Sequence, residues 1–262
     1  MLKQSLKDLI CFILFALCGK RNSGCSILMY HSIGDNNAYF TVTKEAFGRQ
    51  MQYIKDNGYN IIFISELIDK MKKSEQFKNT VCITFDDGYK DNFEIAYPIL
   101  KELGIKATFF IATQNINKTM RTSDGVEISL MKNSELAELA QDKDVAELMP
   151  HTAHHVVLDK VSFEIAASEI SESRKYIESL TLAKADIFAY PKGRYTDAII
   201  DYLRDNEWSG AVTVEGGLIK THDDIFKLKR NSIDSKTSFI QFKTKLSNAI
   251  SIYEGLKNGK TR

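Results

Sequence analysis

The chain has little of several residue types whose abundance would indicate a particular class of protein. Only 3 of its 262 residues are proline and 14 are glycine, which excludes collagen-like and proline-rich low-complexity proteins. Basic residues number 35 and acidic residues 34, so no strong positive field favours nucleic acid as a partner. Because 44% of the residues are hydrophobic, the chain can bury the core of an ordinary globular protein.

The four cysteines form no pattern typical of a disulfide framework or a zinc knuckle. Cys11, Cys18, Cys25 and Cys82 include no CxxC spacing. Cys82 lies in an apolar run, where a thiol behaves as a small hydrophobic side chain. We therefore look for chemistry in other residues.

A short apolar segment near the N-terminus is the part that could contact a membrane. Residues 9–18, LICFILFALC, are fewer than the roughly 20 needed to span a bilayer. Lys3 and Lys7 precede them and Lys20-Arg21 follows, which favours an anchor in the membrane interface over an uncleaved signal peptide or a core helix. We expect a segment 1–25 and one domain 26–262. The expected location is the membrane or cell envelope, with the cytoplasmic face left open.

Strand-like and helix-like segments alternate beyond residue 25. Helices are expected at about 43–57, from Ser65 into 70–76, at 92–104, 133–141, 162–180 and 196–206, and from about Thr237. Strands are expected at 27–30, 60–64, 81–85, 106–112, 187–191 and 210–214, and residues 113–132 are expected to form a long polar loop. This alternation predicts an α/β fold with a parallel sheet, either open and doubly wound or closed into a barrel.

Two adjacent carboxylates follow one of these buried strands. Asp86 and Asp87 come directly after the apolar run that ends at Phe85, and Gly88 follows them. Loops at the carboxyl ends of parallel strands carry the chemistry in such folds. A plain turn would also use Asp and Gly. Neighbouring carboxylates repel each other, however, and raise each other's pKa. Such a pair therefore indicates that a cation lies between the two groups or that they perform different tasks.

Histidines mark two further strand ends. His31 follows the apolar run 27–30 and is either a core residue or a group delivered to a site. His151 and His155 are four residues apart in HTAHH, which on a helical turn would put both imidazoles on one face. With one aspartate they would supply the three protein ligands of a catalytic metal that keeps an open position.

Three motifs together resemble those of the polysaccharide deacetylases, the NodB-homology or carbohydrate esterase family 4 enzymes. They are TFDDG at 84–88, HTAHH at 151–155 and FAYPKGRY at 188–195, and the resemblance covers roughly residues 26–235. It implies a distorted (β/α) barrel with fewer than eight strands. It also implies one divalent metal ion, most often zinc, and removal of acetyl groups from N-acetylated sugars.

The resemblance also implies roles for individual residues. Asp86 matches the catalytic base, and Asp87, His151 and His155 match the metal ligands. The stretch LMYHSI resembles the subgroup that acts on poly-N-acetylglucosamine exopolysaccharides, in which the general acid comes from the first strand. His31 is therefore the predicted acid, in place of the late His222.

One departure from the family's pattern leaves the base without its usual support. Ala189 stands where many members have an arginine that orients the base, so that support must come from elsewhere. Arg230 is the candidate, and the alternative is a surface charge beside a strand. We further predict that substrate binding involves Arg230, Tyr190, Pro191 and Trp208. For Trp208 the predicted role is to line the acetyl pocket, and the alternative is a core position.

The predicted function is a metal-dependent hydrolase that removes N-acetyl groups from a sugar in a polysaccharide or glycan precursor. One alternative is a deacylase or deformylase of a lipid-linked sugar at the membrane face, indicated by the N-terminal apolar segment. Another is an inactive carbohydrate-binding module, which the presence of the base and of all three metal ligands disfavours.

Overall fold

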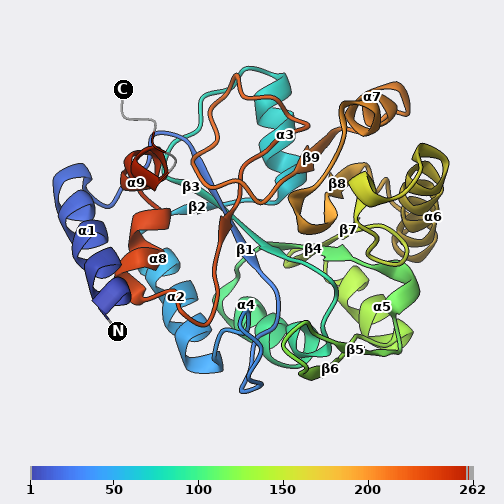
Figure 1. Cartoon of the computed structure of the whole chain (residues 1–262), viewed down its shortest axis with the longest axis horizontal. Helices are drawn as coiled ribbons and strands as arrows, with labels where there is room; N and C mark the ends of the chain where they lie inside the picture. Colours follow the sequence, from blue (N-terminus) through green and yellow to red (C-terminus); the bar gives the residue numbers. More distant parts are fainter. Residues whose placement is uncertain (1, 258, 260–262) are drawn as a thin grey trace.

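The computed structural model describes residues 2–257 and 259, apart from the side chains of Leu2 and Lys3. The expected contact of the Lys3 side chain with the membrane interface therefore lies outside the described residues. Parallel strands occupy the centre, surrounded by helices (Figure 1). The main sheet has the order β10-β1-β3-β4-β7, and β2 also pairs with β3. Its strands are β1 (Cys25–Tyr30), β2 (Asn60–Ile61), β3 (Thr80–Phe85), β4 (Ala107–Ile111), β7 (Ala146–Pro150) and β10 (Asn231–Ser232).

A second parallel pair continues the curve of the sheet. Strands β8 (Ile187–Ala189) and β9 (Gly210–Val212) pair with each other, and Val212 forms a parallel bridge with Leu228 shortly before β10. Every residue of β1 and β3 is buried, because both strands are short apolar runs covered on each face. The alternation predicted from the sequence therefore produces a parallel, strongly curved sheet.

The surrounding helices match most of the predicted segments. They are α1 (Leu2–Cys18), α2 (Lys44–Asp56), α3 (Ile64–Lys72), α4 (Tyr97–Leu103), α5 (Asn133–Gln141), α6 (Phe163–Thr181), α7 (Asp197–Asp205), α8 (Phe239–Lys245) and α9 (Ala249–Lys257). A π-helical turn at Asn92–Ala96 leads into α4. Thr43 caps α2 by accepting a hydrogen bond from the Ala46 N–H, as expected for a helix that starts there.

Three predictions about the bounds of local elements are wrong. Ser65 lies inside α3, because the helix already begins at Ile64, where the Glu66 carboxylate accepts the N–H of the preceding Phe63. This early start also shortens the strand expected at 60–64 to two residues. Residues 113–132 are not one long loop, since β5 (Thr119–Arg121) and β6 (Glu127–Ser129) form an antiparallel hairpin within them.

The N-terminal helix α1 lies beside α8 and α9 at the edge of the molecule (Figure 1). On its inner face Cys11 is buried, and Asp8 accepts hydrogen bonds from Ser238 and Gln241. Its outer face exposes a set of large apolar side chains: Leu6, Leu9, Phe12, Ile13 and Leu17. Among the described residues, no helix has the length and hydropathy to cross a membrane.

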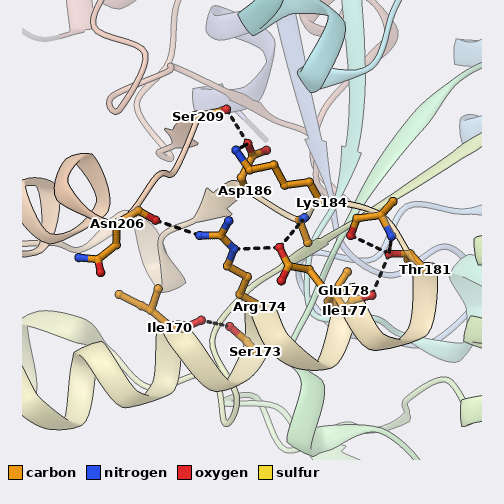
Figure 2. Close-up of polar contacts among 12 residues, drawn as sticks. Ile170, Ser173, Arg174, Ile177, Glu178, Thr181, Lys184, Asp186, Asn206 and Ser209 are labelled. Atoms are coloured by element: carbon orange, nitrogen blue, oxygen red, sulfur yellow. Dashed lines mark hydrogen bonds and ion pairs between the residues drawn. The ribbon is translucent and has the colours of Figure 1, made fainter.

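Polar contacts fix the C-terminal half of α6 to the segments that begin β8 and β9 (Figure 2). Arg174 donates to Glu178 at 2.9 Å on the same helix and to the Asn206 carbonyl at 3.0 Å. Ser209 donates to Asp186 at 2.6 Å, which joins the starts of the two strands. This network positions β8 and β9 and therefore the loops at their opposite ends.

Candidate active site

A cavity of about 550 Å³ opens at the carboxyl ends of the central strands. His31 follows β1, the two aspartates follow β3, and His151 follows β7, and all of them line it. Residues from distant parts of the sequence meet here because the strands are parallel and their carboxyl ends share one edge. The structure thus brings together the five residues predicted to act as base, acid and metal ligands.

Asp87, His151 and His155 converge on one point. The Asp87 Oδ1 atom lies 3.3 Å from His155 Nε2 and 3.6 Å from His151 Nε2. One ligand atom from each of the three residues lies within 4.8 Å of the others. Two imidazole nitrogens and one carboxylate oxygen form a donor set that suits a divalent metal ion.

The surroundings of these three side chains fit a metal rather than a hydrogen-bonded cluster. A carbonyl oxygen can only accept, so His151 Nδ1 carries the proton that it donates to Ala189 O at 2.7 Å. Nε2 is therefore left as a free lone pair facing Asp87. Burial lowers the pKa of His151 to about 4, which keeps this ring neutral. Asp87 Oδ1 is buried and accepts no hydrogen bond, as a ligand atom would.

The two histidines meet through a turn, so the expectation of a helical turn is wrong. Thr152 and His155 have φ of 61° and 59°, in the left-handed region that non-glycine residues rarely adopt. Asp87 does the same with φ of 74°, ahead of Gly88 at 83°. The left-handed turn at Asp87 separates the adjacent carboxylates, so that each faces different partners. Such conformations concentrate at functional sites.

Asp86 forms a buried ion pair with Arg230. The guanidinium donates to its two oxygens at 2.6 and 2.7 Å, and Nε donates to Thr213 O at 2.8 Å. Burial alone would raise the pKa of Asp86, but the charge and hydrogen bonds of Arg230, together with the charges of His151 and His31, outweigh burial and hold that pKa below its usual value. Arg230 therefore supports the side chain predicted to be the base, as expected. It does not line the cavity, so nothing places it in contact with substrate.

His31 precedes the proposed base in the sequence, whereas His151 and His155 follow it, yet all three histidines line the same cavity. The His31 ring packs on Phe40 at a centroid distance of 5.3 Å, and its carbonyl accepts from Asn92 at 2.6 Å. Its Nδ1 atom is buried and has no hydrogen-bond partner among the described residues. By contrast, His154 pairs with Glu169 at 2.8 Å and His222 is exposed, and neither lines the cavity.

The remaining predicted substrate residues are core residues in this structure. Tyr190 is fully buried and donates to Phe226 O at 3.1 Å, and Pro191 is also buried. Trp208 packs edge-on against Phe188 in a second apolar cluster. None of the three lines the cavity. Their burial away from the cavity lining disfavours direct contact with substrate.

Other residues line the cavity without having been predicted. Lys192, the next residue of the YPKG motif, does so, as do Tyr39, Phe40 and Arg121. The motif contained the signal for Lys192, since a polar side chain beside two core residues must face outward. Arg121 carried no such signal, because its position depends on the unpredicted hairpin.

The comparisons with known proteins agree with this geometry. A family model described as polysaccharide deacetylase matches residues 73–228, which is more than half of the chain and includes the two aspartates and both histidines. The chain belongs to the polysaccharide deacetylase family. The recognition made from the three sequence motifs is thereby confirmed.

Individual members of the polysaccharide deacetylase family show the extent of the likeness. Protein YxkH of Bacillus subtilis is 32% identical over 208 residues, covering 78% of this chain and 69% of YxkH. The poly-β-1,6-N-acetyl-D-glucosamine N-deacetylase of Staphylococcus epidermidis is 24% identical, covering 73% and 67%. The Streptococcus pyogenes deacetylase PplD, solved with acetate, has a TM-score of 0.75 at 26% identity, covering 85% and 98%. The predicted NodB-like barrel is thus confirmed.

Proposed function

We propose that this protein is a metal-dependent hydrolase that removes N-acetyl groups from an N-acetylated glycan. The observation that carries the proposal is the meeting of five side chains at one cavity: the paired Asp86, the cluster of Asp87, His151 and His155, and His31. The named activity of the Staphylococcus epidermidis relative supports the same substrate class.

We propose zinc as the ion, because two imidazole nitrogens and one carboxylate are a common catalytic zinc set with one position left open. A divalent ion held there would polarise the amide carbonyl and make a water molecule acidic near neutral pH. Asp87, His151 and His155 would hold it, and the hydrogen bond from His151 to Ala189 would keep the ring orientation fixed.

Asp86 is proposed as the general base. Its pairing with Arg230 keeps the carboxylate ionised and aimed, so an oxygen is available to accept a proton from the attacking water. A carboxylate with a low pKa is a weak base, which means that it can act only on a strongly acidified water. Asp86 and the proposed metal ligand Asp87 line the same cavity, so the base lies in the site where such a water would be held.

His31 is proposed as the general acid. The amine nitrogen leaves only when protonated, since an amine anion is too basic to depart. A protonated imidazole is a common donor of such a proton in general acid catalysis. The ring reaches the cavity from β1, independently of the loops that carry the ligands and the base.

The test is release of acetate from β-linked N-acetylglucosamine oligomers by the zinc-loaded protein. Asp86→Asn should abolish release while leaving the metal content unchanged, because the base is lost and no ligand is. A matched exposed control, Asp56→Asn at the end of α2, should behave as wild type. The proposal would be contradicted if the wild-type protein released acetate from none of the N-acetylated sugars tested.

A second candidate function is deacylation of a lipid-linked sugar at a membrane surface, and the outer face of α1 favours it. Leu6, Leu9, Ile13 and Leu17 follow a three-to-four residue spacing, so they form one apolar stripe, and Leu17 is 79% exposed. Lys20 and Arg21 follow the helix, as is typical of helices that lie on anionic membranes. We propose peripheral membrane contact through this stripe.

This membrane proposal can be tested by substitution rather than by truncation. Deleting residues 1–24 would remove Asn22, whose buried amide donates to Leu246 O at 2.8 Å, and would disturb the fold itself. Leu9→Gln with Leu17→Gln should abolish binding to anionic phosphatidylglycerol vesicles. Leu182→Gln, at an even more exposed apolar residue elsewhere, should not. Equal vesicle binding by wild type, by Leu9→Gln with Leu17→Gln, and by Leu182→Gln would exclude membrane contact through the α1 stripe.

A further inference from the structure

We propose that the cavity selects a glycan that carries an anionic group, a phosphate or a carboxylate, through Arg121 and Lys192. This inference rests on the proposed function and specifies its substrate class. Both side chains line the same cavity as the base and the metal cluster, and they come from different parts of the fold. Arg121 ends β5, and Lys192 lies in the loop after β8.

The β5–β6 hairpin is fixed over the cavity rather than free. Leu130 forms an antiparallel bridge with Tyr89, and the Met131 N–H donates to Gly88 O at 2.9 Å, next to the Asp87 ligand. Leu130 and Tyr89 belong to one buried cluster with Phe40, on which His31 packs. The hairpin therefore holds Arg121 in a constant relation to the reacting groups.

The backbone at Lys192 is also specifically shaped. Lys192 has φ of 56°, in the left-handed region, although it is neither glycine nor asparagine. Gly193 follows with φ of 65°, and a Cβ there would lie 2.4 Å from Val214, so the chain must pass close to that cavity residue. A lysine kept in an unfavourable conformation beside the site is consistent with a binding role.

The charges in the cavity leave these two cations without partners. Within the described part of the chain, no ion pair joins Arg121 or Lys192 to an acid. The acids that line the cavity are otherwise engaged. Asp86 pairs with Arg230, Asp87 faces the histidines, and Asp234 accepts from the Lys236 N–H and the Thr237 hydroxyl, both at 2.9 Å.

A divalent ion held by Asp87, His151 and His155 would make the site positive overall. The charges of Asp86 and Arg230 cancel, and those of Asp87 and Asp234 cancel those of Arg121 and Lys192, so the ion's own two charges would remain. A concave site with net positive charge raises the local concentration of anions. A guanidinium and an ammonium bind phosphate and carboxylate oxygens through charge-assisted hydrogen bonds. The two groups therefore favour an acidic glycan over a neutral one.

The experiment measures binding separately from turnover. His31→Gln, loaded with zinc, is titrated calorimetrically with three β-linked N-acetylglucosamine oligomers of equal length: one neutral, one bearing a 6-phosphate and one bearing a lactyl carboxylate. Arg121→Gln and Lys192→Gln are introduced into this background. Lys55→Gln, an exposed lysine on α2, is the matched control.

We expect the charged oligomers to bind more tightly than the neutral one, and the difference to shrink at high salt. Arg121→Gln and Lys192→Gln should each weaken binding of a charged oligomer by about threefold to tenfold and leave the neutral one unchanged. Whichever acidic oligomer responds more identifies the anion. Equal binding of all three oligomers, or equal losses in the Lys55→Gln control, would overturn the inference. Failure of the wild-type protein to release acetate would instead overturn the proposed function, since the binding comparison does not depend on turnover.

Discussion

Replacing Arg230 with methionine should damage both stability and activity, and the structure sets the scale. Arg230 is fully buried and Asp86 is 3% exposed, so the substitution leaves a carboxylate buried without its counter-charge. Removing one partner of a buried ion pair typically costs about 3–5 kcal/mol. Two further hydrogen bonds, to Thr213 O and to the Thr84 hydroxyl, are lost with the guanidinium. We expect Arg230→Met to lose at least about 3 kcal/mol of unfolding free energy.

The pH dependence of this loss follows from the sign of the pKa shift. In the wild-type protein Arg230 holds the pKa of Asp86 below its unfolded value despite burial. The pair's contribution to stability is therefore present above about pH 4 and is lost as the pH falls further. Without Arg230, burial dominates and raises the pKa of Asp86. The difference in unfolding free energy between wild type and Arg230→Met should then become smaller as the pH falls. The acid limb of the variant's kcat/KM profile should move to higher pH.

A double-mutant cycle measured by urea unfolding separates this account from loss of packing. Asp86→Asn removes the charge that Arg230 neutralises, so Asp86→Asn with Arg230→Met should be less destabilised than the sum of the single variants by about 2 kcal/mol or more. Arg230→Lys, which keeps the charge but loses the fork, should fall between wild type and Arg230→Met. Additive losses, or an acid limb that does not move in Arg230→Met, would refute the reasoning.

Two further predictions concern other parts of the site. His31→Ala should slow hydrolysis of an N-acetyl sugar by about 10²- to 10⁴-fold but cost far less for an activated aryl acetate, whose leaving group needs no proton; equal losses on both substrates would return His31 to a packing role. Burial raises the pKa of Asp91 to about 6, above its unfolded value, although Ser32 donates a hydrogen bond to it. The stabilising proton is present below about pH 4 and is lost as the pH rises through 6, so wild type should lose about 2 kcal/mol across this range. Asp91→Asn should lack that loss when unfolding is followed from pH 4 to 7, and parallel stability curves for the two proteins would exclude it.

The sequence predicted the features of the fold that depend on local pattern. Strands β1 and β3 and helices α2 and α6 were found because apolar runs and helical spacing are visible in a single sequence. Strand β10 was missed because its two residues, Asn231 and Ser232, are not apolar and pair only through tertiary contact. The β5–β6 hairpin was missed for a similar reason, since it is polar and depends on Tyr89 and Leu130 for its position.

The candidate site shows the same division. Its five predicted residues lie together because each follows a strand whose carboxyl end is at one edge of the sheet. The way in which they meet could not be predicted, because left-handed residues such as Asp87 and His155 are not marked by glycine. Tyr190 and Trp208 were assigned to the substrate from motif and residue type, and burial places them in the core.

The measurement that tests the central claim most directly is the metal content and acetate release of one purified protein before and after chelation. With β-linked N-acetylglucosamine oligomers as substrate, we predict about one equivalent of divalent metal per chain and loss of acetate release when it is removed, with recovery on adding zinc. His151→Ala with His155→Ala should retain neither metal nor activity. Acetate release that persists without metal, or metal content unchanged in the variant that lacks both histidines, would contradict the account.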